Sequence, residues 1–258
     1  MTGLANQLRA GLYLLLHDAY FKGAAVVMAM WLSAYGLLTL LPDGGMTFVF
    51  SLGSTFAAAF RLVAFFTCFA MMGLAVHDTA AGGMRAAALA GRGRAGYVAS
   101  RMLLAPLVAV VLAAVATVLL AAMGAMLPRV LVPSPSAVAE VASQLPAYLL
   151  ASWAYAAVGM VLVWAFPRER GIGTVLLGSV VLVTGLLEIA VLMAFVIVPL
   201  TFSPEFAWDL FSALQPVSLS MALQGSLGVG SGYVVLLAVV YLGVAWLLAW
   251  RLWARRAV

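Results

Sequence analysis

Two side chains of opposite charge, Arg61 and Glu188, lie inside long apolar runs of the sequence. A charge inside a bilayer costs at least about 2.5 kcal/mol, so each needs a reason to be there. At 1.5 Å per helical residue, both lie about 22–24 Å from the inner ends of their runs. Equal depth and opposite sign predict an ion pair between two spans. Two roles stay open for it: fixing the packing of the helices, or lining a path through the membrane.

The other side chains capable of chemistry are scattered. Both histidines, His17 and His77, stand next to aspartates outside the apolar runs, and the single cysteine, Cys68, lies within one. Metal, haem or protease chemistry needs His, Cys, Ser or paired carboxylates brought together inside the bundle. The sequence also has no GxxxxGK[ST] phosphate loop. We therefore expect no enzyme, no metal site and no cofactor bound by this chain.

The composition indicates a membrane protein. Of the 258 residues, 66% are hydrophobic and 8% are charged, whereas soluble domains have about 25% charged residues. A span needs about 20 apolar residues, so five or six spans use nearly the whole length and leave one transmembrane domain over 1–258. The net charge is +5, but the basic residues lie between the apolar runs. Proteins that bind nucleic acid instead cluster such residues on one water-facing surface, so nucleic acid is not a favoured partner.

We predict an all-α bundle of six transmembrane helices, because helices satisfy their own backbone hydrogen bonds and no run alternates like a barrel strand. The predicted spans are 23–41, 50–76, 102–127, 145–166, 171–200 and 233–250.

Six spans put both termini on one side, and most of the basic residues lie on that side with them. These are Arg9, Lys22, Arg85, Arg92, Arg94, Arg101, Arg168, Arg170, Arg251, Arg255 and Arg256. The positive-inside rule makes this side cytoplasmic, in a multi-pass protein of the cell membrane.

Residues 3–20 carry five leucines at helical spacing, which favours a helix lying along the cytoplasmic interface over a plain extension of the first span. The cytoplasmic stretch 77–101 is far longer than a connector between adjacent helices requires. Its alanines and arginines fit a further short helix bracketed by glycines. They equally fit a loop whose arginines set the topology and touch lipid headgroups.

The external stretch 202–232 is polar for a span, and we predict two short re-entrant helices broken near Pro216. Phe206, Trp208 and Phe211 stand near its start. They are typical of anchors at the membrane interface; the alternative is a gate over a pore.

This layout resembles the membrane subunit of type-2 ABC exporters, the ABC-2 permease family. The most specific stretch is HDTAAGGMRAAALAGRGRAGYVASRMLLAPLVAVV. In the family an acidic residue leaves the second span, a glycine turn follows, and a short coupling helix leads to a basic residue that opens the third span. Asp78, Gly82 and Arg101 take these places here. The chain departs from the family in having Arg92 and Arg94 around a glycine before the third span.

The resemblance implies a half-transporter. Two permease subunits, identical or related, would pack together, and each would seat its coupling loop, 79–100, on a separate ATP-binding subunit that holds ATP and Mg. The residues implied in coupling are Asp78, Gly82, Gly83, Arg85, Arg92, Arg94 and Arg101. In such relatives typical roles are immunity to antimicrobial peptides and efflux of hydrophobic compounds.

The residues around the expected pore favour an apolar or amphipathic cargo, such as a peptide, lipid or drug, because they include Met, Phe and Trp but few charges. An ion-coupled secondary transporter and a structural or assembly subunit stay open as alternatives.

Overall fold

The computed structural model describes residues 2–38, 52–80, 93–126, 135–166, 171–223 and 230–255. Every element in these ranges is helical, as the sequence predicts. The helices are α1 (Thr2–His17), α2 (Ala19–Leu38), α3 (Leu52–Ala80), α5 (Gly93–Met126), α6 (Pro135–Ala165), α7 (Ile172–Val183), α8 (Leu186–Phe202), α9 (Pro204–Leu214), the 3-10 turn η1 (Gln215–Val217), α10 (Leu219–Leu223) and α11 (Ser231–Arg255).

Four of these helices are long and apolar enough to cross a membrane, namely the segments Ala59–Ala80, Gly96–Ala122, Ala142–Ala165 and Ser231–Leu252. Two further pairs of helices pass the same test only when taken together. The pair α1 and α2 is bent by 58° and the pair α7 and α8 by 62°. The chain therefore has four to six candidate spans, which is compatible with a multi-pass membrane protein.

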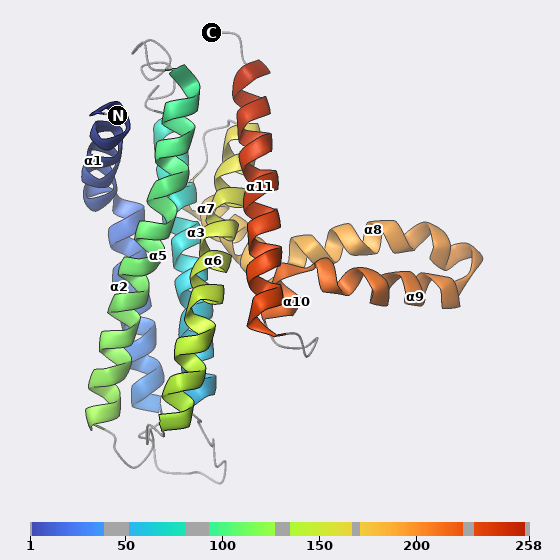
Figure 1. Cartoon of the computed structure of the whole chain (residues 1–258), viewed down its shortest axis with the longest axis horizontal. Helices are drawn as coiled ribbons and strands as arrows, with labels where there is room; N and C mark the ends of the chain where they lie inside the picture. The colour runs from blue at the N-terminus through green and yellow to red at the C-terminus, as the bar shows by residue number, and fades with distance from the viewer. Residues whose placement is uncertain are drawn as a thin grey trace.

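The long helices stand side by side as a bundle with α3 in the middle (Figure 1). Helix α3 packs most extensively on α6, and it also contacts α2, α5 and α7. The membrane-length segment of α3 is 83% buried inside the bundle, whereas the corresponding segment of α11 is only 28% buried. A displacement of α3 must therefore disturb most of the bundle, whereas α11 leaves a broad apolar face uncovered.

Helix α1 and the C-terminal turns of α11 lie at the same end of the bundle (Figure 1), which we call the terminal end. The C-terminal end of α3 and the first turns of α5 lie there too. Helices α8 and α9 pack on each other and form a hairpin that projects sideways from the bundle, roughly across the direction of the long helices (Figure 1).

The predicted span 171–200 is not one straight helix. Helix α7 ends at Val183, a turn follows at Thr184 and Gly185, and α8 leaves at an angle of 62°. Gly185 has φ 76°, a left-handed conformation that glycine adopts without strain. The side chain of Ser220 lies directly against it and leaves no room for a Cβ atom. The chain therefore turns out of the bundle at the residue that tolerates the turn best.

The stretch 202–232 contains α9, η1 and α10, and its chain direction changes around Pro216 within η1. Its external position remains a prediction, and so does the interfacial position of α1. Most of the predicted coupling loop, residues 81–92, lies outside the described ranges.

Close packing of α2 on α3 depends on Gly73, where a Cβ atom would come within 2.6 Å of Tyr20 Cβ. We predict that Gly73→Ala lowers the midpoint of thermal unfolding in detergent, because overpacking forces the helices apart at a cost of about 1–3 kcal/mol. The matched control is Gly23→Ala in α2, where the new methyl group would have nothing within 4 Å. Equal midpoints for the two variants would contradict this packing.

Candidate functional site

At the terminal end, one buried carboxylate holds two helices together. Arg101 of α5 approaches Asp78 of α3 with both arms of its guanidinium group: Nε lies 2.7 Å from Oδ2, and Nη2 donates to Oδ1 at 2.8 Å. The hydroxyl of Tyr97 donates to the same Oδ2 at 2.5 Å. Asp78, Arg101 and Tyr97 are each 6–7% exposed. We call these three residues the clamp.

The local sequence explains the clamp. Tyr97 and Arg101 are four residues apart, so they project from the same face of α5 toward one partner. The guanidinium carbon of Arg101 also lies 5.2 Å from the centre of the Tyr97 ring, a cation–π distance. The planar guanidinium group faces the carboxylate with Nη2 hydrogen-bonded to Oδ1 and Nε in ionic contact with Oδ2, an orientation that the point charge of a lysine ammonium group would not define. The clamp therefore fixes orientation as well as distance between α3 and α5.

Helix α1 lies against the clamp. A Cβ atom on Gly11 would come within 2.6 Å of Arg101 Nη1 and of Leu104 Cδ1, so the backbone of α1 passes close over both side chains. At the junction of α1 and α2, Asp18 accepts a hydrogen bond of 2.6 Å from the backbone N–H of Tyr20. The same carboxylate lies 3.6 Å from Nδ1 of His77. Helices α1, α2, α3 and α5 are thus tied together at this end.

The clamp joins the two helices that flank segment 81–92. Asp78 lies in the last turn of α3 before the segment, and Arg101 lies in the early turns of α5 after it. Of the predicted coupling residues, Gly82, Gly83, Arg85 and Arg92 fall within 81–92, outside the described ranges, and Arg94 belongs to α5 with a side chain that is not described. The structure brings together Asp78 and Arg101 from that set.

A second polar centre surrounds Glu188 in α8. Its Oε2 accepts hydrogen bonds from the hydroxyl of Ser218 and from the backbone N–H of Ser220, the latter at 3.1 Å. The Ser218 oxygen also accepts from the N–H of Met221 at 3.3 Å. Glu188 thereby fastens the start of α10 to α8.

Two tyrosines of α11 hold the neighbouring turn η1. The hydroxyl of Tyr233 donates to the carbonyl of Pro216 at 2.8 Å, and that of Tyr241 donates to the carbonyl of Val217 at 3.1 Å. These bonds, together with those of Glu188, tie the turn after the α8–α9 hairpin to the bundle.

The predicted ion pair between Arg61 and Glu188 is not formed in this structure. Asp78 forms an ion pair with Arg101, Asp18 lies beside His77, and neither contact involves Arg61 or Glu188. Arg61 is exposed on α3, while Glu188 is bonded to Ser218, just before α10, and to Ser220 within it. The prediction placed Glu188 by counting residues along a straight helix, and the bend at Gly185 removes the basis of that count.

The predicted gate residues lie on the projecting hairpin and the turn that follows it. Phe206 and Trp208 are exposed in α9, and the Trp208 ring stands edge-on to that of Phe211 with centroids 6.1 Å apart. Pro216 lies in η1, where Tyr233 binds its carbonyl. The structure thus places the four residues on one continuous segment, and their role as a gate remains a prediction.

Several partners in these two centres were not identified from the sequence. Tyr97 could have been found, because it stands one helical turn before Arg101 in the same helix. Ser218 and Ser220 lie in the stretch 202–232, whose polarity is evident from the sequence, but nothing local connects them with Glu188, some thirty residues away. In the ranges that the structure covers, no group of three or more His, Cys, Asp or Glu side chains could hold a metal ion.

Comparison with known proteins gives no match, either to a family model or to a curated protein. The function is therefore argued from the two polar centres and the arrangement of the helices.

The clamp predicts that the stability of the folded chain depends strongly on the pairing of Asp78 with Arg101. Arg101→Leu leaves the Asp78 carboxylate buried and unpaired, and we expect a loss of about 3 kcal/mol. The double variant Asp78→Leu with Arg101→Leu should lose far less than the sum of the single losses, as measured by thermal unfolding in detergent. Arg251→Leu, an exposed arginine near the same end, is the control. Additive losses at Asp78 and Arg101 would contradict the clamp.

The separation of Arg61 from Glu188 is tested by two double-mutant cycles with alanine. Arg61 and Glu188 should lose stability additively to within about 0.5 kcal/mol, because they share no partner. Glu188 and Ser218 should instead show a coupling of about 1 kcal/mol or more, since their hydrogen bond involves a charged acceptor. The opposite pattern would restore the ion pair and remove the Ser218 contact.

Proposed function

We propose that this chain is the membrane-spanning permease subunit of an ABC exporter of the ABC-2 type, driven by ATP hydrolysis on a separate subunit. The observation that carries the proposal is the clamp, a buried ion pair between the helices on either side of segment 81–92 in an otherwise apolar bundle. In this proposal 81–92 is the cytoplasmic coupling segment. The chain itself has no ATPase site and binds no cofactor, and ATP and Mg belong to the partner.

The mechanical argument is as follows. A partner that closes on ATP can move this chain only through a contact that stays attached in both states. A flexible tether would absorb such a movement, whereas the clamp holds the two ends of the segment in a fixed relation to each other. From there a displacement passes into α3, which contacts α2, α5, α6 and α7. Because packed interiors resist compression, the bundle would shift as helices and not deform locally.

The orientation in this proposal follows from charge. Arg9, Lys22 and Arg251 belong to the helices that meet at the terminal end. Basic residues beside spans favour the cytoplasmic side, so the terminal end would face the cytoplasm and the ATPase. The opposite end would then face outward, and the sideways-projecting segment with Phe206, Trp208, Phe211 and Pro216 would serve as the gate beside the path.

The uncovered apolar surface supports a second permease subunit, identical or related. The projecting hairpin exposes Phe195, Ile197, Phe202, Phe206 and Trp208, each by more than half of its surface. Its α9 also carries Glu205 and Asp209, both exposed, and carboxylates are costly in lipid. A protein partner or a watery path beside the hairpin accounts for both features. The cargo suited to such walls is apolar or amphipathic: a peptide, lipid or drug.

One observation favours the alternative of an ion-coupled secondary transporter. Glu188 is a carboxylate at a break between helices, and helix breaks are where such transporters hold their ions. A purely structural or assembly subunit is the third candidate. Purification from the native membrane separates them, because co-isolation of an ATP-binding subunit supports the exporter and its absence supports a rival.

Coupling gives a direct test in the complex with its ATPase. Proline substitution within residues 84–90 should abolish transport-coupled ATP turnover, because proline breaks the helix proposed there, while insertion into the membrane stays intact. Coupled turnover and membrane insertion are measured on the same preparation. Proline at Ile172, the first residue of α7, is the control, since the first helical turn tolerates proline. Wild-type turnover in the 84–90 variants would refute the proposal.

A further inference from the structure

Glu188 has no basic side chain among its partners in the described residues, so nothing there cancels the charge of its ionised form. Its hydrogen-bond donors in the described residues are the hydroxyl of Ser218 and the backbone N–H of Ser220, and the nearby Tyr241 hydroxyl, which donates to Val217, is uncharged as well. The predicted counter-charge, Arg61, does not pair with it. Neutral donors stabilise a carboxylate, but the net charge remains, and in an apolar bundle it is costly.

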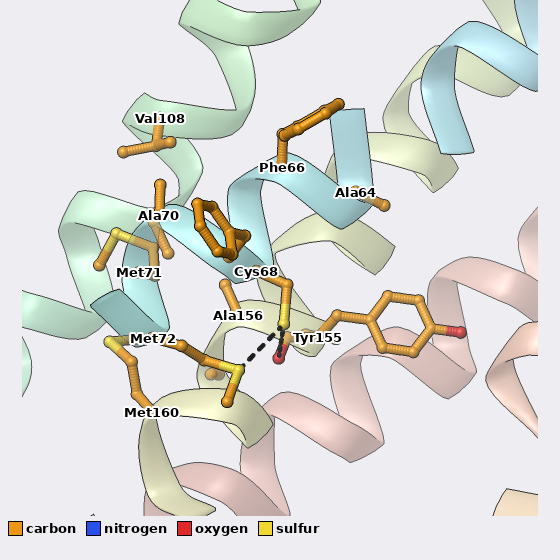
Figure 2. Close-up of a cluster of buried hydrophobic side chains, with 14 of the residues drawn as sticks. Ala64, Phe66, Cys68, Ala70, Met71, Met72, Val108, Tyr155, Ala156 and Met160 are labelled. Carbon is orange, nitrogen blue, oxygen red and sulfur yellow. Dashed lines mark hydrogen bonds between the residues drawn. The ribbon is translucent and has the colours of Figure 1, made fainter. Parts of the chain in front are cut away.

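Two buried hydroxyl groups in the surroundings of Glu188 have no hydrogen-bond partner among the described residues. Tyr155 and Ser220 are each 2% exposed, and neither Tyr155 Oη nor Ser220 Oγ is bonded within the part of the chain described. The Ser220 side chain lies against Gly185, three residues before Glu188, and Tyr155 lies within electrostatic range of Glu188 and Tyr241. Figure 2 shows the Tyr155 ring extending away from Cys68 and Met72, so its hydroxyl lies away from that sulfur cluster.

Buried hydroxyls are normally bonded, so two without partners beside one unneutralised carboxylate point to a missing ligand. Carboxylate and hydroxyl oxygens accept contacts from hard cations and from ammonium protons. One carboxylate neutralises one positive charge, whereas a divalent ion would leave the site charged again. The site also lies at a helix break, where backbone geometry leaves oxygens free to bind ions.

We propose that Glu188, together with Ser218, Ser220 and Tyr155, forms a binding site for a singly charged cation. The cation is either a free sodium ion or the protonated amine of a cargo molecule. The sodium form does not depend on the proposed ATPase, whereas the amine form rests on the proposed export of cargo. In both forms the cation neutralises Glu188 and takes up the free hydroxyl oxygens.

The test uses the purified full-length chain in detergent without any ATPase, so its result is independent of the proposed motor. The midpoint of thermal unfolding is measured in rising sodium chloride or methylammonium chloride, with bulky N-methylglucamine chloride keeping the ionic strength constant. A ligand that binds the folded chain raises the midpoint, by roughly 3–6 °C at ten times its dissociation constant. A rise with sodium alone identifies a free ion, and a rise with methylammonium alone identifies an amine.

Variants assign the effect to the site. Glu188→Gln keeps an oxygen for Ser218 and Ser220 but removes the charge, and it should abolish the rise. Tyr155→Phe, which removes only a hydroxyl, should weaken cation binding about fivefold. Glu205→Gln, at an exposed carboxylate of α9, is the control and should respond as the wild type does. No rise with either cation in the wild type, or the same rise in Glu188→Gln, would overturn the proposal.

Discussion

The arrangement at the terminal end depends on one carboxylate. Asp78 accepts one hydrogen bond from Nη2 of Arg101 and one from the hydroxyl of Tyr97, and Nε of Arg101 lies in ionic contact with it, where all three side chains are nearly inaccessible to water. A buried charge without its partner is far more costly than the pair is favourable, so α3 and α5 can separate only with a large loss of stability. Helix α1 crosses this pair at Gly11, which leaves Arg101 little room to move. The clamp is therefore the point at which a force on segment 81–92 must enter the bundle.

The two polar centres of the chain differ in charge balance. At the clamp a cation and an anion cancel, and the result is a rigid joint. Within the described residues, the partners of Glu188 are uncharged, and two buried hydroxyls in its surroundings have none. A rigid, charge-balanced contact such as the clamp suits the transmission of movement. The surroundings of Glu188, which lack a balancing charge, can instead change conformation with the ligand that occupies them. Because Glu188 also fastens α10 to α8, filling that centre would tighten the connection between the projecting hairpin and α11.

Much of this could be predicted from the sequence, and the failures have definite causes. Apolar runs and their lengths identify the long helices, since a bilayer imposes that pattern. The resemblance to the ABC-2 loop drew attention to Asp78 and Arg101 as coupling residues, but it did not predict that they pair with each other. The turn at Gly185 was missed because a glycine inside an apolar run resembles any glycine of a membrane helix; only its contact with Ser220, distant in sequence, distinguishes it. The supposed partnership of Arg61 and Glu188 failed for the same reason, since depth counted along a sequence assumes that the helix continues straight.

The central claim is that segment 81–92 receives movement from a nucleotide-binding partner. A photoreactive amino acid placed at Ala87, in the complex isolated from its native membrane, tests this contact most directly, with the same probe at Gly230 near the opposite end as the reference. The account predicts a cross-link from position 87 to an ATP-binding subunit and none from position 230. A cross-link from position 230 alone, or the absence of any ATP-binding protein at position 87, would contradict it.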